Sequence, residues 1–218
     1  KDILLYGLVS RGYKSGSFPT VPASTTAQFR PVTQERVTAY EAGVKITALT
    51  GRLQINAAGF HYQYDDKQVR GIILDPIFNQ LELLVNIPKS RINGGELEVI
   101  YQPVTGLTLH GGATYIDAKV TDFIGLNNNR VTGNFDGAQL PFSPKWNLVG
   151  DVNYEFDIGA DSQAYLGANA LHNSSSNSTL ITGPASRPDL SFINAFTTVD
   201  ARAGVRFGDS KFDLSVWG

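Results

Sequence analysis

The sequence predicts an all-β fold: an up-and-down antiparallel β-barrel that spans a membrane. Three observations support this prediction. Apolar and polar residues alternate at every second position over most of the 218-residue chain. The alternating segments run to a dozen residues or more, whereas soluble strands cluster near about 5 to 6 residues. Short and long connections also alternate along the chain, as expected for periplasmic turns and extracellular loops.

The segment from Ser143 to Asp157 shows the alternation most clearly. Its apolar face begins at Trp146 and ends at Phe156, ten residues later. At roughly 3.3 Å per residue and a tilt of about 40°, these two rings lie about 25 Å apart along the membrane normal. This spacing matches the apolar band of an outer-membrane barrel between its two aromatic girdles.

The other elements follow from the same alternation. Strands are expected, in order, at residues 2–14, 36–49, 52–73, 83–102, 107–122, 143–157, 162–173, 196–207 and 211–218. The short connections are residues 50–51, 103–106, 158–161 and 208–210. The long connections are residues 15–35, 74–82, 122–142 and 173–195. Aromatic residues on the apolar faces are expected to form the lipid-facing girdles: Tyr40, Tyr101, Tyr115, Trp146, Tyr154, Phe156, Phe207 and Phe212.

A soluble β-sandwich also alternates apolar and polar positions along its strands. The length of the segments argues against it, and so does an apolar face rich in Ala, Gly and Tyr. No apolar run is long enough for a transmembrane helix. The absence of cysteine suits an oxidising envelope compartment, and a net charge of -2 argues against a nucleic-acid surface. No signal peptide precedes Lys1 and both ends lie inside strands, so a fragment of a larger barrel is expected.

A set of short segments follows the predicted strands along the chain: Leu5–Gly16, Tyr40–Lys45, Gly51–Ala58, Gly95–Glu98 followed by Pro103 and Gly106–Leu109, Tyr115–Ala118, Leu140–Trp146 and Leu214–Gly218. In sequence, order and spacing, these segments resemble successive barrel strands of TonB-dependent outer-membrane receptors over nearly the whole chain.

The resemblance implies a roughly 22-stranded, plugged barrel in the outer membrane of a Gram-negative bacterium. Residues 1–218 would form about nine of its strands, with the plug domain and the final strand absent. The family imports scarce nutrients such as siderophore–iron complexes, cobalamin or glycans. The implied partners are outer-membrane lipid and lipopolysaccharide, the protein's own plug, TonB with ExbB and ExbD acting through the plug, and a small-molecule nutrient.

Substrate contacts are expected in the long loops and on the lumen face. Arg130 and Arg187 would clasp carboxylates or a catecholate complex, whereas residues 127–129 and Asp136 would suit sugar hydroxyls or calcium. The loop candidates are Phe78, Phe123, Arg130, Phe135, Asp136, Arg187 and Phe192. The charged lumen face is expected to comprise Arg11, Glu41, Lys45, Glu96, Glu98, Asp151, Glu155, Arg202 and Arg206, with Arg11 and Arg202 as substrate-binding candidates.

No catalytic constellation is evident in the sequence. His61, His110 and His172 stand at no paired metal-ligand spacing. His172 precedes Ser174, but no orienting carboxylate or nucleophile elbow accompanies them. The sequence therefore predicts a transporter without catalytic residues, metal site or cofactor. The alternative is a passive porin, with the same wall and no plug; an outer-membrane enzyme or adhesin would need catalytic groups or repetitive binding loops.

Overall fold

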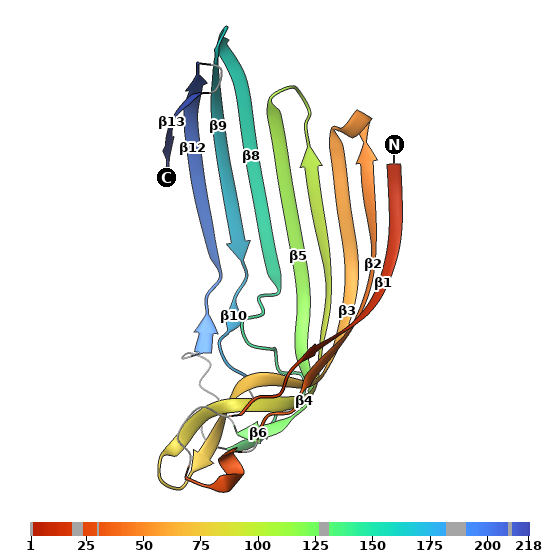
Figure 1. Cartoon of the computed structure of the whole chain (residues 1–218), viewed down its shortest axis with the longest axis vertical. Helices are drawn as coiled ribbons and strands as arrows, with labels where there is room; N and C mark the ends of the chain where they lie inside the picture. The colour runs from red at the N-terminus through yellow and green to blue at the C-terminus, as the bar shows by residue number, and fades with distance from the viewer. Residues whose placement is uncertain (1, 19–23, 30, 127–130, 182–190, 209–210) are drawn as a thin grey trace.

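The computed structural model describes residues 2–18, 24–29, 31–126, 131–181, 191–208 and 211–218. These residues form a long, curved antiparallel sheet (Figure 1). Its path contains nine strands: β1 (Asp2–Lys14), β2 (Glu35–Ala48), β3 (Leu53–Asp75), β4 (Asn79–Tyr101), β5 (Leu107–Asp122), β8 (Trp146–Gly159), β9 (Ser162–Asn173), β12 (Phe196–Phe207) and β13 (Phe212–Trp217). The smaller elements are β6 (Ile124–Leu126), β7 (Thr132–Asn134), β10 (Ser176–Asn177), β11 (Phe192–Ile193) and the 3-10 helices η1 (Thr26–Phe29) and η2 (Leu49–Gly51).

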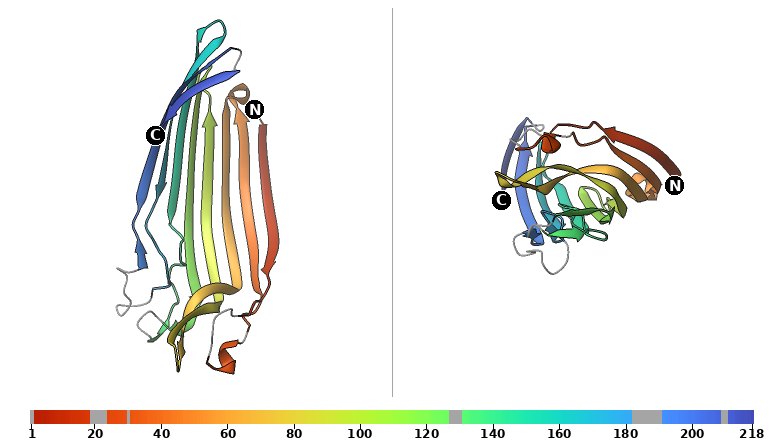
Figure 2. Two further views of the ribbon diagram at one scale, coloured as in Figure 1. Left: turned by 60° about the vertical axis from the view of Figure 1, so that its left-hand side comes forward. Right: turned by 90° about the horizontal axis from the view of Figure 1, so that it is seen from below.

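Each long strand pairs antiparallel with the next long strand in the chain. β1 and β13 form the two edges, and they are not paired with each other in the part of the chain that the structure describes. The sheet is strongly curved when it is viewed along its strands (Figure 2, right). The predicted all-β, up-and-down architecture is therefore confirmed.

The short turns gather at one end of the sheet, and a glycine shapes the turn between β4 and β5. Gly106 has a φ of +83, and a Cβ there would lie 2.0 Å from the carbonyl oxygen of Glu155. Its own carbonyl accepts the N–H of Glu155 at 2.9 Å. The turn therefore docks against β8 only because residue 106 has no side chain.

The prediction of a long loop at residues 74–82 is wrong. β3 continues to Asp75 and β4 starts at Asn79, with pairing from Lys67↔Ile87 out to Asp75↔Asn79. The Asp75 carboxylate accepts the N–H groups of Ile77 and Phe78, each at 2.7 Å, and so closes a tight turn. Residues 67–87 thus extend the β3–β4 hairpin, and this extension is called the arm below. The arm bends across the loop end of the sheet (Figures 1 and 2).

The main buried core lies at the loop end of the sheet, where the loop after β5 packs on β4 and β5. Its members are 0 to 2% exposed, and they come from β4, from β5 and from the loop that follows β5: Ile87, Ala118, Val120, Phe135 and Leu140. Two backbone hydrogen bonds attach this loop to β5, from Leu140 N to Ala118 O at 3.0 Å and from Val120 N to Ala138 O at 2.9 Å. The loops thus fold into a packed cap, and the strands beyond it keep two open faces.

Among the described residues, no helix combines the length and the apolar character that crossing a membrane would require.

Candidate functional site: the polar face and the mouth

The strand register divides the sheet into an apolar face and a polar face. One apolar row runs across four strands through Leu109, Val152, Ala168 and Ala201. Because side chains alternate between faces, every second residue from these positions shares their side. All eight predicted girdle aromatics lie on this apolar face: Tyr40, Tyr101, Tyr115, Trp146, Tyr154, Phe156, Phe207 and Phe212.

The aromatics occupy the two ends of the apolar face. Near the loops, the rings of Tyr115 and Trp146 lie 4.9 Å apart between centroids. Near the turns, Tyr154 stacks on Phe156 at 5.3 Å, and Phe207 stacks on Phe212 at 5.4 Å. This arrangement is typical of aromatic belts at two lipid–water boundaries; that these rings face lipid stays a prediction.

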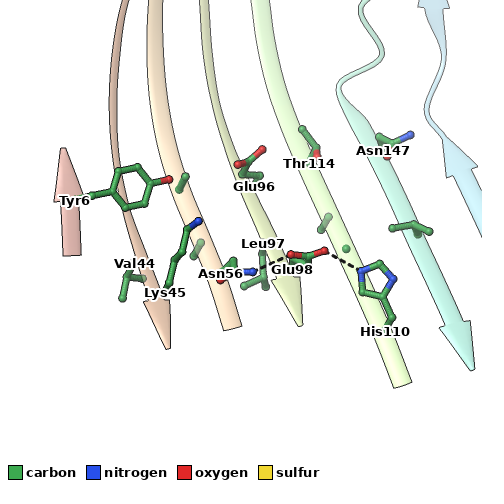
Figure 3. Close-up of a pocket in the computed structure, with 15 residues that line it drawn as sticks. Tyr6, Val44, Lys45, Asn56, Glu96, Leu97, Glu98, His110, Thr114 and Asn147 are labelled. Atoms are coloured by element: carbon green, nitrogen blue, oxygen red, sulfur yellow. Dashed lines mark hydrogen bonds and ion pairs between the residues drawn. The ribbon is translucent and has the colours of Figure 1, made fainter. Parts of the chain in front are cut away.

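On the polar face, β1 and β2 are joined through an aromatic hydroxyl. The Tyr6 hydroxyl donates to Glu41 Oε1 at 2.9 Å, and Lys45 Nζ lies 6.0 Å from the centre of the Tyr6 ring. The ring has room because its partner on β2 is Gly43, where a Cβ would lie 2.6 Å from the ring. Tyr6, which the sequence did not single out, thus belongs to the polar face (Figure 3).

A second polar group lies on β3, β4 and β5. Asn56 Nδ2 donates to Glu98 Oε2 at 2.9 Å, and His110 Nε2 lies 3.2 Å from Glu98 Oε1. Glu96 stands one step along β4, directly opposite Thr114. Together with Tyr6 and Lys45 these side chains line a recess of about 380 Å³ (Figure 3).

Two arginines on β12 contact acidic and amide side chains of β8 on the polar face. Arg202 lies 3.6 Å from an Asp151 oxygen and donates to Asn153 Oδ1 at 3.2 Å. Arg206 lies 3.4 Å from a Glu155 oxygen. The Arg202 charge is therefore already compensated across β8 and β12, and a ligand would have to compete with Asp151 for it.

The expectation that Arg11 lines the lumen is wrong. Arg11 pairs with Thr38, which places it on the same face as Val9 and Tyr40, the apolar face. β1 has apolar residues on both sides, with Leu8 next to Val9, so its alternation does not identify a face. The face of each β1 residue is therefore known only from its pairing with β2.

At the loop end, the arm and the loops that follow β5 and β9 enclose two adjoining recesses of about 520 and 560 Å³, together called the mouth. Arg70 and Glu82 line both, with Arg70 Nη1 3.9 Å from Glu82 Oε2 and side chains 79% and 58% exposed. The other walls are mainly apolar. They include Ile73, Val85, Phe123, Leu126, Leu140, Phe142 and Leu180.

Lys67 lines the larger recess and marks the base of the arm. Its Nζ lies 3.9 Å from the centre of the Tyr64 ring and 3.7 Å from a Glu35 oxygen. Burial lowers the pKa of Lys67, and the nearby Glu35 carboxylate opposes that shift. Sequence reasoning missed Lys67, Arg70 and Glu82 because it did not continue the hairpin; the Asp75–Pro76 turn signal was available.

The structure places the predicted substrate-binding residues of the loops in different surroundings. Phe123 lines the smaller recess, and its ring lies 5.2 Å from that of Phe135. The proposed substrate contact by Phe135 is wrong, because that side chain is 2% exposed and belongs to the core. The Asp136 carboxylate accepts the Phe123 N–H at 3.1 Å and Asn134 Nδ2 at 3.2 Å, so it already holds the loop together.

Phe78 and Phe192 are both 50% exposed, at the tip of the arm and in β11 respectively. Their contact with a ligand stays a prediction. Arg130, Arg187 and residues 127–129 lie outside the described residues. Within the described ranges, no three His, Asp or Glu side chains form a group that could hold a metal ion.

Comparison with known proteins agrees with this architecture. The family model described as "TonB dependent receptor-like, beta-barrel" matches residues 1–218. The ferric yersiniabactin uptake receptor FyuA from Yersinia pestis is 18% identical, with a TM-score of 0.71 over 99% of this chain and 29% of that chain. The copper transporter OprC is 17% identical, with a TM-score of 0.67 over 99% of this chain and 31% of that chain.

The ferric preacinetobactin receptor BauA from Acinetobacter baumannii is 17% identical, with a TM-score of 0.65 over 98% of this chain and 28% of that chain. The chain thus spans less than a third of the length of these three proteins. At these identities the solved structures show the shared fold, while the family match covers every residue. The chain belongs to the TonB-dependent receptor β-barrel family, whose members are proteins of the Gram-negative outer membrane.

Proposed function

We propose that the full protein is an active outer-membrane transporter, which binds a small anionic nutrient chelate at its mouth and imports it with energy from TonB. The family match supports this proposal, as do similar folds in the ferric yersiniabactin receptor and the copper transporter. The observation that carries it is the pair of recesses beside Arg70. Apolar walls with a few convergent polar groups are typical of small-molecule sites.

Arg70 and Phe123 are the proposed primary contacts. A guanidinium recognises carboxylate, phenolate or catecholate oxygens, and an aromatic ring packs on a flat chelator. Further proposed loop contacts are Phe78, Arg130, Asp136 and Arg187, with Arg202 on the path along the polar face. A siderophore–iron complex fits this chemistry, whereas cobalamin or a glycan offers less negative charge.

The polar face is the proposed seat of an N-terminal plug. Its mixed charges, including Lys45 and Glu96, would give a polar domain hydrogen-bond partners at little cost while the interface stays hydrated. In this proposal residues 1–218 supply about nine barrel strands and other parts of the protein supply the plug and the final strand. TonB with ExbB and ExbD would act on the plug.

Uptake measured with and without TonB tests the proposal. Cells carrying the full protein are given iron-55 on a panel of anionic chelators, and surface binding and internal label are counted separately. Loss of TonB is expected to abolish internalisation and to leave binding intact. Unchanged internalisation would favour the passive porin, since a mixed-charge polar face also suits a water-filled channel.

Two substitutions test the site itself. Arg70→Gln removes the guanidinium and is expected to weaken chelate binding by roughly tenfold, the usual loss for one charge-assisted hydrogen bond. Arg52→Gln, an equal charge change at the turn end of the sheet, serves as the matched control. Equal binding by both variants would remove Arg70 from the site without affecting the conclusion about TonB.

A further inference from the structure

A row of five polar side chains, three of them cations, crosses the apolar face at the loop end. The register aligns Arg11, Thr38, Gln63, Arg91 and Lys119 across β1 to β5. Adjacent strands lie about 4.8 Å apart, so the row extends over about 19 Å. All five side chains point to the girdle side of the sheet, because they share its alternation.

On each strand, the row lies two residues closer to the loops than the row that contains Tyr40. The neighbouring row toward the turns is Val9, Tyr40, His61, Asn93 and Asp117. Two residues of a strand span about 7 Å, which at a tilt of about 40° is about 5 Å along the membrane normal, so Arg11 and Thr38 lie about 5 Å beyond Val9 and Tyr40. If Tyr40 marks the edge of the hydrocarbon, the part of the row beside it, at Arg11 and Thr38, lies at the depth of the lipid headgroups.

Most of these charges lack a protein partner. Lys119 Nζ contacts Asp117 at 3.0 Å, and in the next outward row Arg36 contacts Asp65 at 2.6 Å. Arg11 and Arg91 are exposed, and no ion pair or hydrogen bond engages their side chains within the described part of the chain. Lys89, level with Asp65, is likewise exposed.

The turn end of the same face has a different character. There the rows consist of Ile3, Ile46, Ile55 and Val99, and then of Ala48, Leu53, Tyr101 and Leu109. On β1 to β5, the cations of the apolar face are thus confined to its loop end. Cations placed at random on this surface would be expected at both the loop end and the turn end.

We infer that this row binds the phosphate groups of lipid headgroups in the outer leaflet. Guanidinium groups bind phosphate with paired, charge-assisted hydrogen bonds, and lysine adds a point charge. The row is wide enough to meet two phosphates of one large headgroup or of two neighbouring lipids. The inference concerns the outer wall and is independent of the nutrient that the protein transports.

Binding of diphosphorylated lipid A to the purified full-length receptor in neutral detergent tests this inference. Each basic residue near an anionic lipid surface contributes roughly a fivefold gain in affinity. Arg11→Gln/Arg91→Gln is therefore expected to weaken binding by about 25-fold. Arg52→Gln/Lys211→Gln, with the same charge loss at the turn end, is expected to bind as the wild type does. Arg11→Lys/Arg91→Lys is expected to retain most of the binding.

Three results would overturn the inference. One is equal affinity of the Arg11→Gln/Arg91→Gln variant and the wild type. Another is an equal effect of the same variant on dephosphorylated lipid A, which would show that phosphate is not recognised. The third is displacement of the lipid by inorganic phosphate at matched phosphate concentration, which would make the row a site for free anions. The single variants Arg11→Gln and Arg91→Gln, each expected to lose about fivefold, provide the same test if the double variant fails to fold.

Discussion

The hydroxyl of Ser24 donates a hydrogen bond to the carboxylate of Asp75 at 2.5 Å, across 51 residues of sequence. The Ser24 N–H also donates to this carboxylate, at 3.1 Å. Because Asp75 binds the N–H groups of Ile77 and Phe78 as well, one buried carboxylate both closes the tip of the arm and fastens the first long loop to it.

Asp75→Asn is expected to loosen the arm. An amide replaces one acceptor oxygen with a donor, so it cannot accept all four hydrogen bonds. Amide hydrogen exchange in peptides covering residues 67–87 should accelerate at neutral pH, while exchange in β8 and β9 stays unchanged. Unaltered exchange in the arm would show that Asp75 does not hold it.

Acid should have the same local effect. Burial raises the pKa of Asp75, but hydrogen bonds from Ser24, Phe78 and Ile77 outweigh it and hold this pKa well below its ordinary value. A carboxyl group with a lowered folded-state pKa stabilises the folded arm above its unfolded pKa of about 4, and this contribution is lost as the pH falls through the folded value. Exchange in the arm, corrected for the intrinsic rate, should be flat from about pH 8 to 5 and rise only below about pH 4. A rise between pH 7 and 5 would contradict this assignment.

Phe135→Ala is expected to destabilise the cap at the loop end. Truncating a buried phenylalanine costs about 3 to 5 kcal/mol through lost burial and the cavity left behind. Phe192→Ala, at a side chain that is 50% exposed, is the control and should cost far less. Limited proteolysis within residues 123–143 reports the difference; equal cleavage of the two variants would show that the cap does not depend on Phe135.

Gly106→Ala should destabilise the barrel where Gly111→Ala does not. Residue 106 has positive φ and no space for a Cβ, whereas a Cβ at residue 111 meets nothing within 4 Å. A strained backbone of this kind costs about 1 to 3 kcal/mol. Urea unfolding of the full barrel in detergent measures both variants, and indistinguishable midpoints would count against the role given to this turn.

The strands could be predicted because their alternation has a direct physical cause: each strand separates an apolar from a polar surrounding. The alternation predicts Trp146 and Tyr154 on the same face as Tyr40, and the strand register agrees. It failed for Arg11, because Leu4, Leu5, Leu8 and Val9 make both sides of β1 apolar.

The structure of the mouth was less predictable because it depends on contacts between residues far apart in the sequence. Phe135 occurs in an irregular loop, where no periodicity distinguishes a buried ring from an exposed one. Arg70 and Glu82 became visible as a pair only when the arm brought them together, although Asp75–Pro76 marked the turn. Local sequence therefore predicts the wall of this barrel better than its entrance.

The central claim is that the apolar face meets lipid and the opposite face lines the lumen. Reversible unfolding of the full barrel in bilayers, with Val152→Arg and Val149→Arg, tests it most directly. Val152 pairs with Leu109 on the apolar face, whereas Val149 pairs with Gly112 on the polar face, three residues away on the same strand. Arginine near the hydrocarbon midplane costs roughly 2 to 4 kcal/mol, while a polar lumen hydrates or pairs the charge. The predicted result is a free energy of unfolding lowered by about that amount for Val152→Arg and much less for Val149→Arg; equal losses, or the reverse order, would contradict the assignment of both faces.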